Sequence, residues 1–86
     1  MHRTTARFWT CFACLPEAVQ RVARQNFELL KENPAHPSLH FKKIGTLWSV
    51  RAGTNHRAIA VEESGDYIWL WIGPHDEYKR LIKQQG

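Results

Sequence analysis

The sequence predicts an α+β fold in which an N-terminal helical hairpin packs on a four-stranded antiparallel sheet, followed by a short C-terminal helix. Three observations predict it. Apolar residues recur at helical spacing through the first 32 residues. Four runs with strand character follow from position 39 onward, separated by short turn-forming stretches. The 86 residues, 43% hydrophobic and 23% charged, are typical of one folded domain, which we expect to span residues 1–86.

Two amphipathic helices are expected at the start of the chain. Thr4 or Thr5 can cap the first, because a threonine hydroxyl accepts a hydrogen bond from a free backbone N–H of the first turn. Its apolar positions recur at helical spacing and are Trp9, Phe12 and Leu15. Pro16 suits the first turn of the second helix, which Asn33 and Pro34 end.

The remaining elements predict an antiparallel meander. The expected strands are 39–44, 47–52, 57–62 and 67–72, with a last helix over 76–84. The strand 67–72 is apolar on both faces, so we expect it to lie inside the sheet with cover on each side. Strict alternation places Ile68, Leu70 and Ile72 on one face. The opposite face then receives Tyr67, Trp69 and Trp71.

Positive charge is concentrated in the middle of the chain. The formal net charge is +4, and no Asp or Glu occurs from position 33 to position 61. This stretch contains Lys42, Lys43, Arg51 and Arg57, together with His36, His40 and His56. Because guanidinium and ammonium groups bind phosphate, the pattern favours a polyanionic partner such as nucleic acid. Solvated strand residues, or an ion pair with Glu62 or Glu63, are the alternatives.

His75 and Tyr78 follow directly after the apolar strand 67–72 and can both exchange protons. Together with the cations they would supply what RNA cleavage needs, namely positive charge for the phosphorane and groups to move two protons. An ordinary exposed turn is the alternative interpretation of His75 and its neighbours.

The cysteines do not predict a metal site. Cys11 and Cys14, with His36 and His40, resemble a zinc motif, but 21 residues separate the two pairs and Pro37 keeps both histidines off one helix. We expect reduced cysteines packed on a helix, and neither metal nor cofactor. The apolar run at positions 8–15 is too short for a membrane span and lacks a signal cleavage site, so we expect a cytoplasmic protein without membrane contact.

Four segments match a known family in order and approximate spacing. They read LPEAVQRVARQNFELLKENP, HPSLHFKKIG, WSVRAGTNHRAIAV and WLWIGPHDEYKRLI. The matching motifs are Lys43-Ile44-Gly45, Arg51-Ala52-Gly53, Arg57 and the hexapeptide GPHDEY at 73–78. The sequence thereby resembles the RelE/ParE superfamily of toxins from type II toxin–antitoxin systems. It departs from the pattern in three ways. Family members usually open with a β-strand, whereas this chain is expected to enter helix almost at once; many have arginine at position 75; and the spacing from His75 to Tyr78 is tight.

The resemblance implies a cognate antitoxin and, for RelE-like members, metal-independent cleavage of mRNA in the ribosome through the RNA 2′-hydroxyl. Arg51 and Arg57 would stabilise the scissile phosphate, while His75 and Tyr78 would move protons. Lys42, Lys43 and His56 would bind RNA, one of the lysines assisting the 2′-hydroxyl. A ParE-type toxin that binds DNA gyrase and an inactive relative that binds only antitoxin or nucleic acid are the alternatives. The full set of candidate residues favours the ribonuclease.

Overall fold

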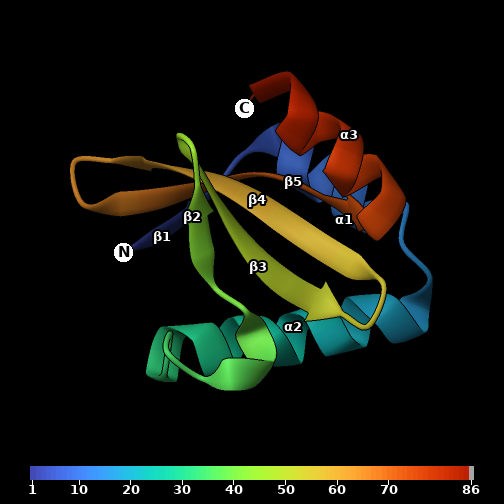
Figure 1. Ribbon diagram of the computed structural model, residues 1–86. Helices are drawn as coiled ribbons and strands as arrows, with labels where there is room; N and C mark the ends of the chain where they lie inside the picture. Colours follow the sequence, from blue (N-terminus) through green and yellow to red (C-terminus); the bar gives the residue numbers. More distant parts are fainter. Residues whose placement is uncertain (86) are drawn as a thin grey trace.

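A twisted sheet lies at the centre of the protein, and helices cover both of its faces (Figure 1). The computed structural model describes residues 1–85. Within this range the elements are β1 (His2–Thr4), α1 (Ala6–Ala13), α2 (Glu17–Glu32), the 3₁₀ turn η1 (Pro37–Leu39), β2 (Lys42–Ile44), β3 (Leu47–Gly53), β4 (His56–Glu63), β5 (Asp66–Pro74) and α3 (His75–Gln85). The sheet order is β1-β5-β4-β3-β2. The predicted α+β class is confirmed, with one strand more than expected.

The predicted helical hairpin is confirmed in α1 and α2, which lie on the same face of the sheet. Thr5 caps α1, and the backbone N–H of Phe8 donates to its Oγ1 at 3.2 Å. Pro16 is the N-cap residue of α2 and not part of its first turn, and Asn33 is the C-cap residue. The hairpin and sheet enclose the larger apolar core, whose members include Phe12, Leu30, Val50, Ala58, Trp69 and Ile72.

The fifth strand corrects the prediction that the chain enters helix almost at once. β1 pairs in parallel with β5, with His2 opposite Tyr67 and Thr4 opposite Trp69. Arg3 Nε lies 3.2 Å from the carboxylate of Asp66, which adds an ion pair to this edge. Three residues are too few to show strand periodicity, so the pairing depends on contacts 65 positions away in the sequence. The prediction of a wholly antiparallel sheet was therefore wrong at this edge.

Two further predictions about strands were wrong in detail. The strand expected over 39–44 covers only Lys42–Ile44, because Pro37–Leu39 forms a 3₁₀ turn and His40 has a left-handed backbone with φ of 48°. In β5 a register shift opposite Ile59 and Ala60 interrupts the alternation. Trp69 and Ile72 therefore both join the core under the hairpin, while Trp71 faces α3. β5 itself lies inside the sheet, as predicted.

The second face of the sheet is only partly covered, because α3 contacts β4 and β5. A smaller core forms there from Leu47, Ile59, Trp71 and Tyr78. The side chains of Trp69 and Trp71 are 2% and 6% exposed, which leaves neither indole free to stack on bases. No helix among residues 1–85 has the length and apolar character needed to cross a membrane.

We expect Thr5→Ala to lower the free energy of unfolding by about 1–2 kcal/mol. Thr5 caps α1 and also donates from Oγ1 to the backbone oxygen of Trp69 at 3.0 Å, so one hydroxyl joins the helix to β5. Urea denaturation followed by circular dichroism measures the change. Thr10→Ala is the matched control, because the exposed Thr10 hydroxyl bonds only Ala6 O of its own helix. Equal losses in both variants would contradict the dual role of Thr5.

Candidate nucleic-acid interface

The register of β2, β3 and β4 determines which of the predicted cations share a face. Arg51 lies directly opposite Arg57, and Lys42 directly opposite Ser49. Residues paired across antiparallel strands project to the same face, as do residues two apart on one strand. Lys42, Ser49, Arg51 and Arg57 therefore define one surface, called here the cation face, on the side of the sheet where α3 packs.

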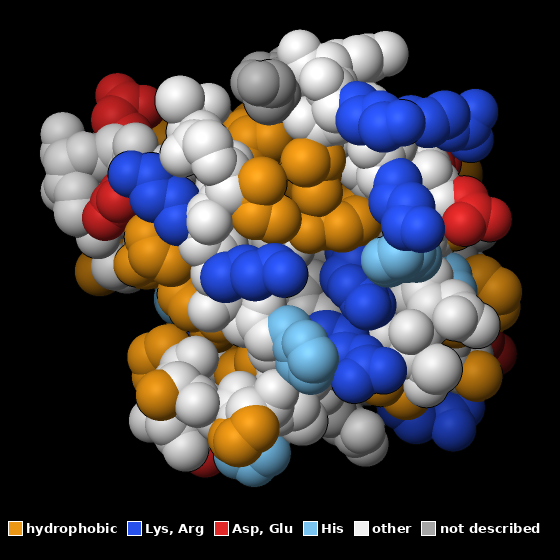
Figure 2. All heavy atoms as spheres, in the orientation of Figure 1, with side chains coloured by type: hydrophobic (Ala, Val, Ile, Leu, Met, Phe, Trp, Pro, Cys, Tyr) orange, Lys and Arg blue, Asp and Glu red, His pale blue; other side chains and the backbone are white. Residues whose placement is uncertain are grey.

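Lys43 lies on the other side of β2 by register. It pairs with Trp48, which packs against the core under the hairpin. Both lysines are exposed, but only Lys42 shares a face with the two arginines. Figure 2 shows Lys, Arg and His side chains gathered over the region where β3, β4 and the start of α3 meet, beside a group of apolar side chains.

The two arginines form a like-charged pair without a compensating carboxylate. Directly opposite like charges destabilise a sheet. Within residues 1–85 the ion pairs involve Asp66 and Glu28, and neither Arg51 nor Arg57 takes part in one. This surface therefore carries an uncompensated positive charge that a bound anion would neutralise.

The guanidinium of Arg57 is fixed at the β3–β4 turn. Its Nη1 donates to the backbone oxygens of His56 at 2.8 Å, Gly53 at 3.3 Å and Thr54 at 3.5 Å. Partial burial and the nearby Arg51 lower the pKa of Arg57, while Tyr78 acts in the opposite direction. An arginine stays protonated at neutral pH despite such a shift. Within the described chain, Nε and Nη2 have no protein acceptor, so their N–H groups remain available to an anion.

Two histidines lie at the same end of the sheet as the arginines. His56 opens β4 opposite Pro74 and directly precedes Arg57, so by strand alternation its side chain lies on the hairpin side of the sheet, where it lines a small pocket with Val19 and Val22. Partial burial and the charge of Arg57 lower the pKa of its imidazole. His75 begins α3, and its backbone N–H donates to Asn55 O at 2.8 Å, which joins the helix start to the β3–β4 turn. Both imidazoles are half-buried. The structure thus brings the two arginines and the two histidines to one end of the sheet.

Tyr78 occupies a different environment from the one that the sequence predicted for a proton donor. Its side chain is 6% exposed, and its hydroxyl lies 2.7 Å from Ser49 Oγ, with either oxygen able to donate. The ring centroids of His75 and Tyr78 are 5.6 Å apart. Tyr78 therefore supports the site from within the protein. Ser49 was missed in the sequence, where its only signal is a polar residue alternating with Trp48 and Val50 in a strand.

We expect Tyr78→Phe and Ser49→Ala each to lower the free energy of unfolding by about 1–3 kcal/mol, because each leaves a buried hydroxyl without its partner. The double variant should lose less than the sum, since neither hydroxyl then remains unpaired. A double-mutant cycle from urea unfolding measures the coupling. Additive losses would show that the 2.7 Å contact contributes no stability.

The candidate zinc residues do not come together. Cys11 is half-buried, Cys14 is exposed, and both thiols are free. Packing on the helix is thus confirmed for Cys11 and wrong for Cys14. Among residues 1–85, no group of three or more His, Cys, Asp or Glu side chains is arranged to hold a metal ion.

The hairpin, the mixed sheet and the terminal helix together form a fold similar to that of solved RelE toxins. Comparisons with protein-family models and with curated proteins find no match. Solved structures are similar throughout the fold. A chain of the RelB–RelE antitoxin–toxin complex from Methanococcus jannaschii superposes with a TM-score of 0.71 at 12% identity, covering 92% of this chain and 96% of that chain.

Two other solved structures are similar to this chain in fold. A chain of the RelE–RelB complex from Pyrococcus horikoshii OT3 gives a TM-score of 0.63 at 22% identity, covering 86% of this chain and 92% of that one. The isolated RelE toxin from E. coli gives a TM-score of 0.62 at 10% identity, and the match covers 98% of this chain and 96% of that chain. The resemblance to the RelE/ParE superfamily is therefore confirmed at the level of the fold.

Proposed function

We propose that the protein is the toxin of a type II toxin–antitoxin pair and that it cleaves mRNA on the ribosome. The observation that carries this proposal is the Arg51–Arg57 pair, which stands on an open face without a paired carboxylate among the described residues and at the end of the sheet where α3 begins with His75. Two uncompensated guanidinium groups cost stability, so their presence at one spot favours a role in binding a phosphodiester.

The proposed reaction uses the RNA itself as the nucleophile. The 2′-oxygen forms a bond to phosphorus, the bond from phosphorus to the 5′-oxygen breaks, and a 2′,3′-cyclic phosphate results. One proton leaves the 2′-hydroxyl and one reaches the departing 5′-oxygen. Arg51 and the fixed Arg57 stabilise the charge that develops on the phosphorane oxygens. His75 moves one of the protons, while Tyr78 and Ser49 hold the start of α3 in position.

The remaining predicted residues contribute to RNA binding in this proposal. Lys42 is on the cation face and assists the 2′-hydroxyl, whereas Lys43 contacts RNA from the opposite side of β2. His56 lies on the hairpin side at the same end of the sheet, and its lowered pKa favours the neutral imidazole, so it acts as a hydrogen-bonding group in this proposal.

The proposed partner is a cognate antitoxin, and the proposed location is the cytoplasm, where ribosomes are found. Two of the structural relatives are toxins crystallised with their antitoxins, which supports this partner. An antitoxin would be expected to carry negative charge opposite the cation face. Co-expression with the product of the neighbouring reading frame, followed by purification of a stable complex, tests the pairing.

The test of function is a reconstituted translation reaction with purified protein. The 5′ ends of a defined message are mapped with and without ribosomes, for the wild type and for Arg57→Ala. Arg21→Ala is the matched control, because Arg21 is an exposed arginine of α2 away from the cation face. Cleavage inside codons that requires ribosomes and Arg57 would support the proposal.

Two outcomes would overturn it. Intact messages together with DNA breaks in a gyrase assay would favour the ParE-type alternative. Intact messages without growth arrest on expression would favour an inactive relative. Both alternatives fit the same fold, since a fold does not fix an activity.

A further inference from the structure

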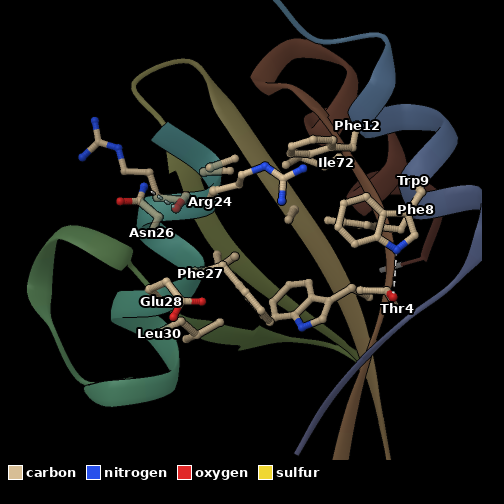
Figure 3. Close-up of a pocket in the computed structure, with 16 residues that line it drawn as sticks. Thr4, Phe8, Trp9, Phe12, Arg24, Asn26, Phe27, Glu28, Leu30 and Ile72 are labelled. Atoms are coloured by element: carbon tan, nitrogen blue, oxygen red, sulfur yellow. Dashed lines mark hydrogen bonds between the residues drawn. The ribbon is translucent and has the colours of Figure 1, made fainter. Parts of the chain in front are cut away.

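A cavity of about 440 Å³ lies between the helical hairpin and the sheet, on the face opposite the cation face. Its walls are mostly apolar, and its larger apolar lining side chains include Phe8, Phe12, Phe27, Leu30, Trp69 and Ile72. Figure 3 shows these rings and aliphatic groups arranged around the space between α1 and α2. The volume falls in the range of small-molecule sites, about 300–1,000 Å³. We call it the hairpin cavity.

Small residues explain why the cavity is open. Ala23 of α2, Ala52 of β3 and Ala58 of β4 all line it. Larger side chains at these positions would fill the space between the helices and the sheet. Protein interiors are otherwise close-packed, and unfilled apolar volume lowers stability. An occupant with an apolar body would recover the lost contacts.

Arg24 gives the hairpin cavity a cationic end. Its guanidinium carbon lies 4.9 Å from the centroid of the Phe12 ring and 5.9 Å from that of Trp9. Figure 3 shows Arg24 reaching from α2 toward these two aromatic residues. Within residues 1–85, Arg24 has no carboxylate partner, and the lining residue Glu28 is paired with Lys31 at 2.7 Å. A cation supported by aromatic faces is thus free to bind an anion.

The aromatic side of the entrance is held in place by the protein itself. Trp9 Nε1 donates to Thr4 Oγ1 at 2.9 Å, which fixes the indole relative to β1. Trp9 is 43% exposed although it lies on the helix stripe predicted to be buried. An exposed and fixed indole beside a free guanidinium suits the recognition of a ligand that is apolar at one end and anionic at the other.

We propose that the hairpin cavity binds a small apolar monocarboxylate, with its hydrocarbon body in the chamber and its carboxylate on Arg24. The site is separate from the cation face and does not depend on RNA cleavage. Lining chemistry selects the ligand: apolar walls exclude sugars and nucleotides, and the Arg24 guanidinium matches one carboxylate. Arg51 also lines the cavity, where its backbone oxygen accepts from Asn26 Nδ2 at 3.2 Å, while by register its side chain belongs to the cation face.

Isothermal titration calorimetry and ¹H–¹⁵N NMR test the proposal, with sodium decanoate below its micellar concentration as the probe and 1-decanol as its uncharged match. We expect saturable binding of decanoate, with shifts at Phe8, Phe27 and Trp69. Decanol should bind about tenfold more weakly, as expected for loss of one charge-assisted contact. Arg24→Gln should remove this difference, Arg24→Lys should restore part of it, and Arg21→Gln should leave it unchanged.

Several results would overturn the proposal. These are the absence of saturable binding, equal affinity for decanoate and decanol in the wild type, and equal effects of Arg24→Gln and Arg21→Gln. Shifts centred on Leu81 and Ile82, on the opposite side of the sheet, would assign the ligand to another surface. Concentration-dependent self-association with shifts in the hairpin cavity would instead show that a second copy of the chain occupies it. Thermal unfolding of each variant verifies that the fold is retained.

Discussion

We expect Arg57→Ala to lower the rate of ribosome-dependent mRNA cleavage by about 10²–10³-fold, the loss typical of removing one preorganised donor to a charged transition state. Arg57 is suited to this role because three backbone oxygens already hold its Nη1. The remaining N–H groups therefore need little reorganisation when charge develops on the phosphorane. Single-turnover cleavage of a defined message on programmed ribosomes measures the effect.

Stability provides the control for Arg57→Ala. Arg57→Ala relieves Arg51 of a repulsive neighbour but also removes the hydrogen bonds from Nη1 to three backbone oxygens, so we expect the free energy of unfolding to change by no more than about 1 kcal/mol. A variant that is inactive and nearly as stable as the wild type would separate function from folding. Arg57→Lys keeps the charge but loses the paired donors, so we expect intermediate activity. Full activity of Arg57→Ala would refute the assignment of this residue.

The helices and the meander could be predicted because local signals agree with the fold. Thr5, Pro16 and Asn33 mark the ends of α1 and α2, and a glycine lies in or directly before each turn between β2, β3, β4 and β5. β1 could not be predicted, since three residues carry no period and the pairing with β5 is a tertiary contact. The register shift near Leu70 could not be predicted either. Both faces of β5 are apolar, so the sequence pattern is the same with or without a shift in the alternation.

The candidate site could be predicted in part. The motifs around Arg51, Arg57 and His75 indicated the cations and the histidine, and the structure brings them to one end of the sheet. The sequence did not show which of Lys42 and Lys43 shares a face with the arginines. That depends on the register of β2 against β3, and two adjacent lysines are equally compatible with either register. The burial of Tyr78 on Ser49 depends on how α3 packs, and no spacing in the sequence reveals that contact. The chemical roles of these residues remain predictions.

We expect His75→Ala to lower the cleavage rate by about 10²–10⁴-fold, the usual contribution of a positioned acid or base. His75 is half-buried at the start of α3, next to the Tyr78 ring and at the end of the sheet that carries Arg57. Its backbone N–H, which holds the helix to Asn55, is retained in the variant. The fold should therefore persist while proton transfer is lost.

Chemical rescue distinguishes proton transfer from simple RNA binding. Added imidazole should restore part of the activity of His75→Ala, because the substitution leaves space beside Tyr78 for the free base. His56→Ala is the matched variant: it removes a neighbouring half-buried imidazole with an RNA-binding role, so we expect weaker binding and no rescue. Rescue of His56→Ala but not of His75→Ala would exchange the two roles. Full activity of His75→Ala would place the proton-transfer group elsewhere on the cation face, where Lys42 is the other titratable side chain predicted to reach the 2′-hydroxyl.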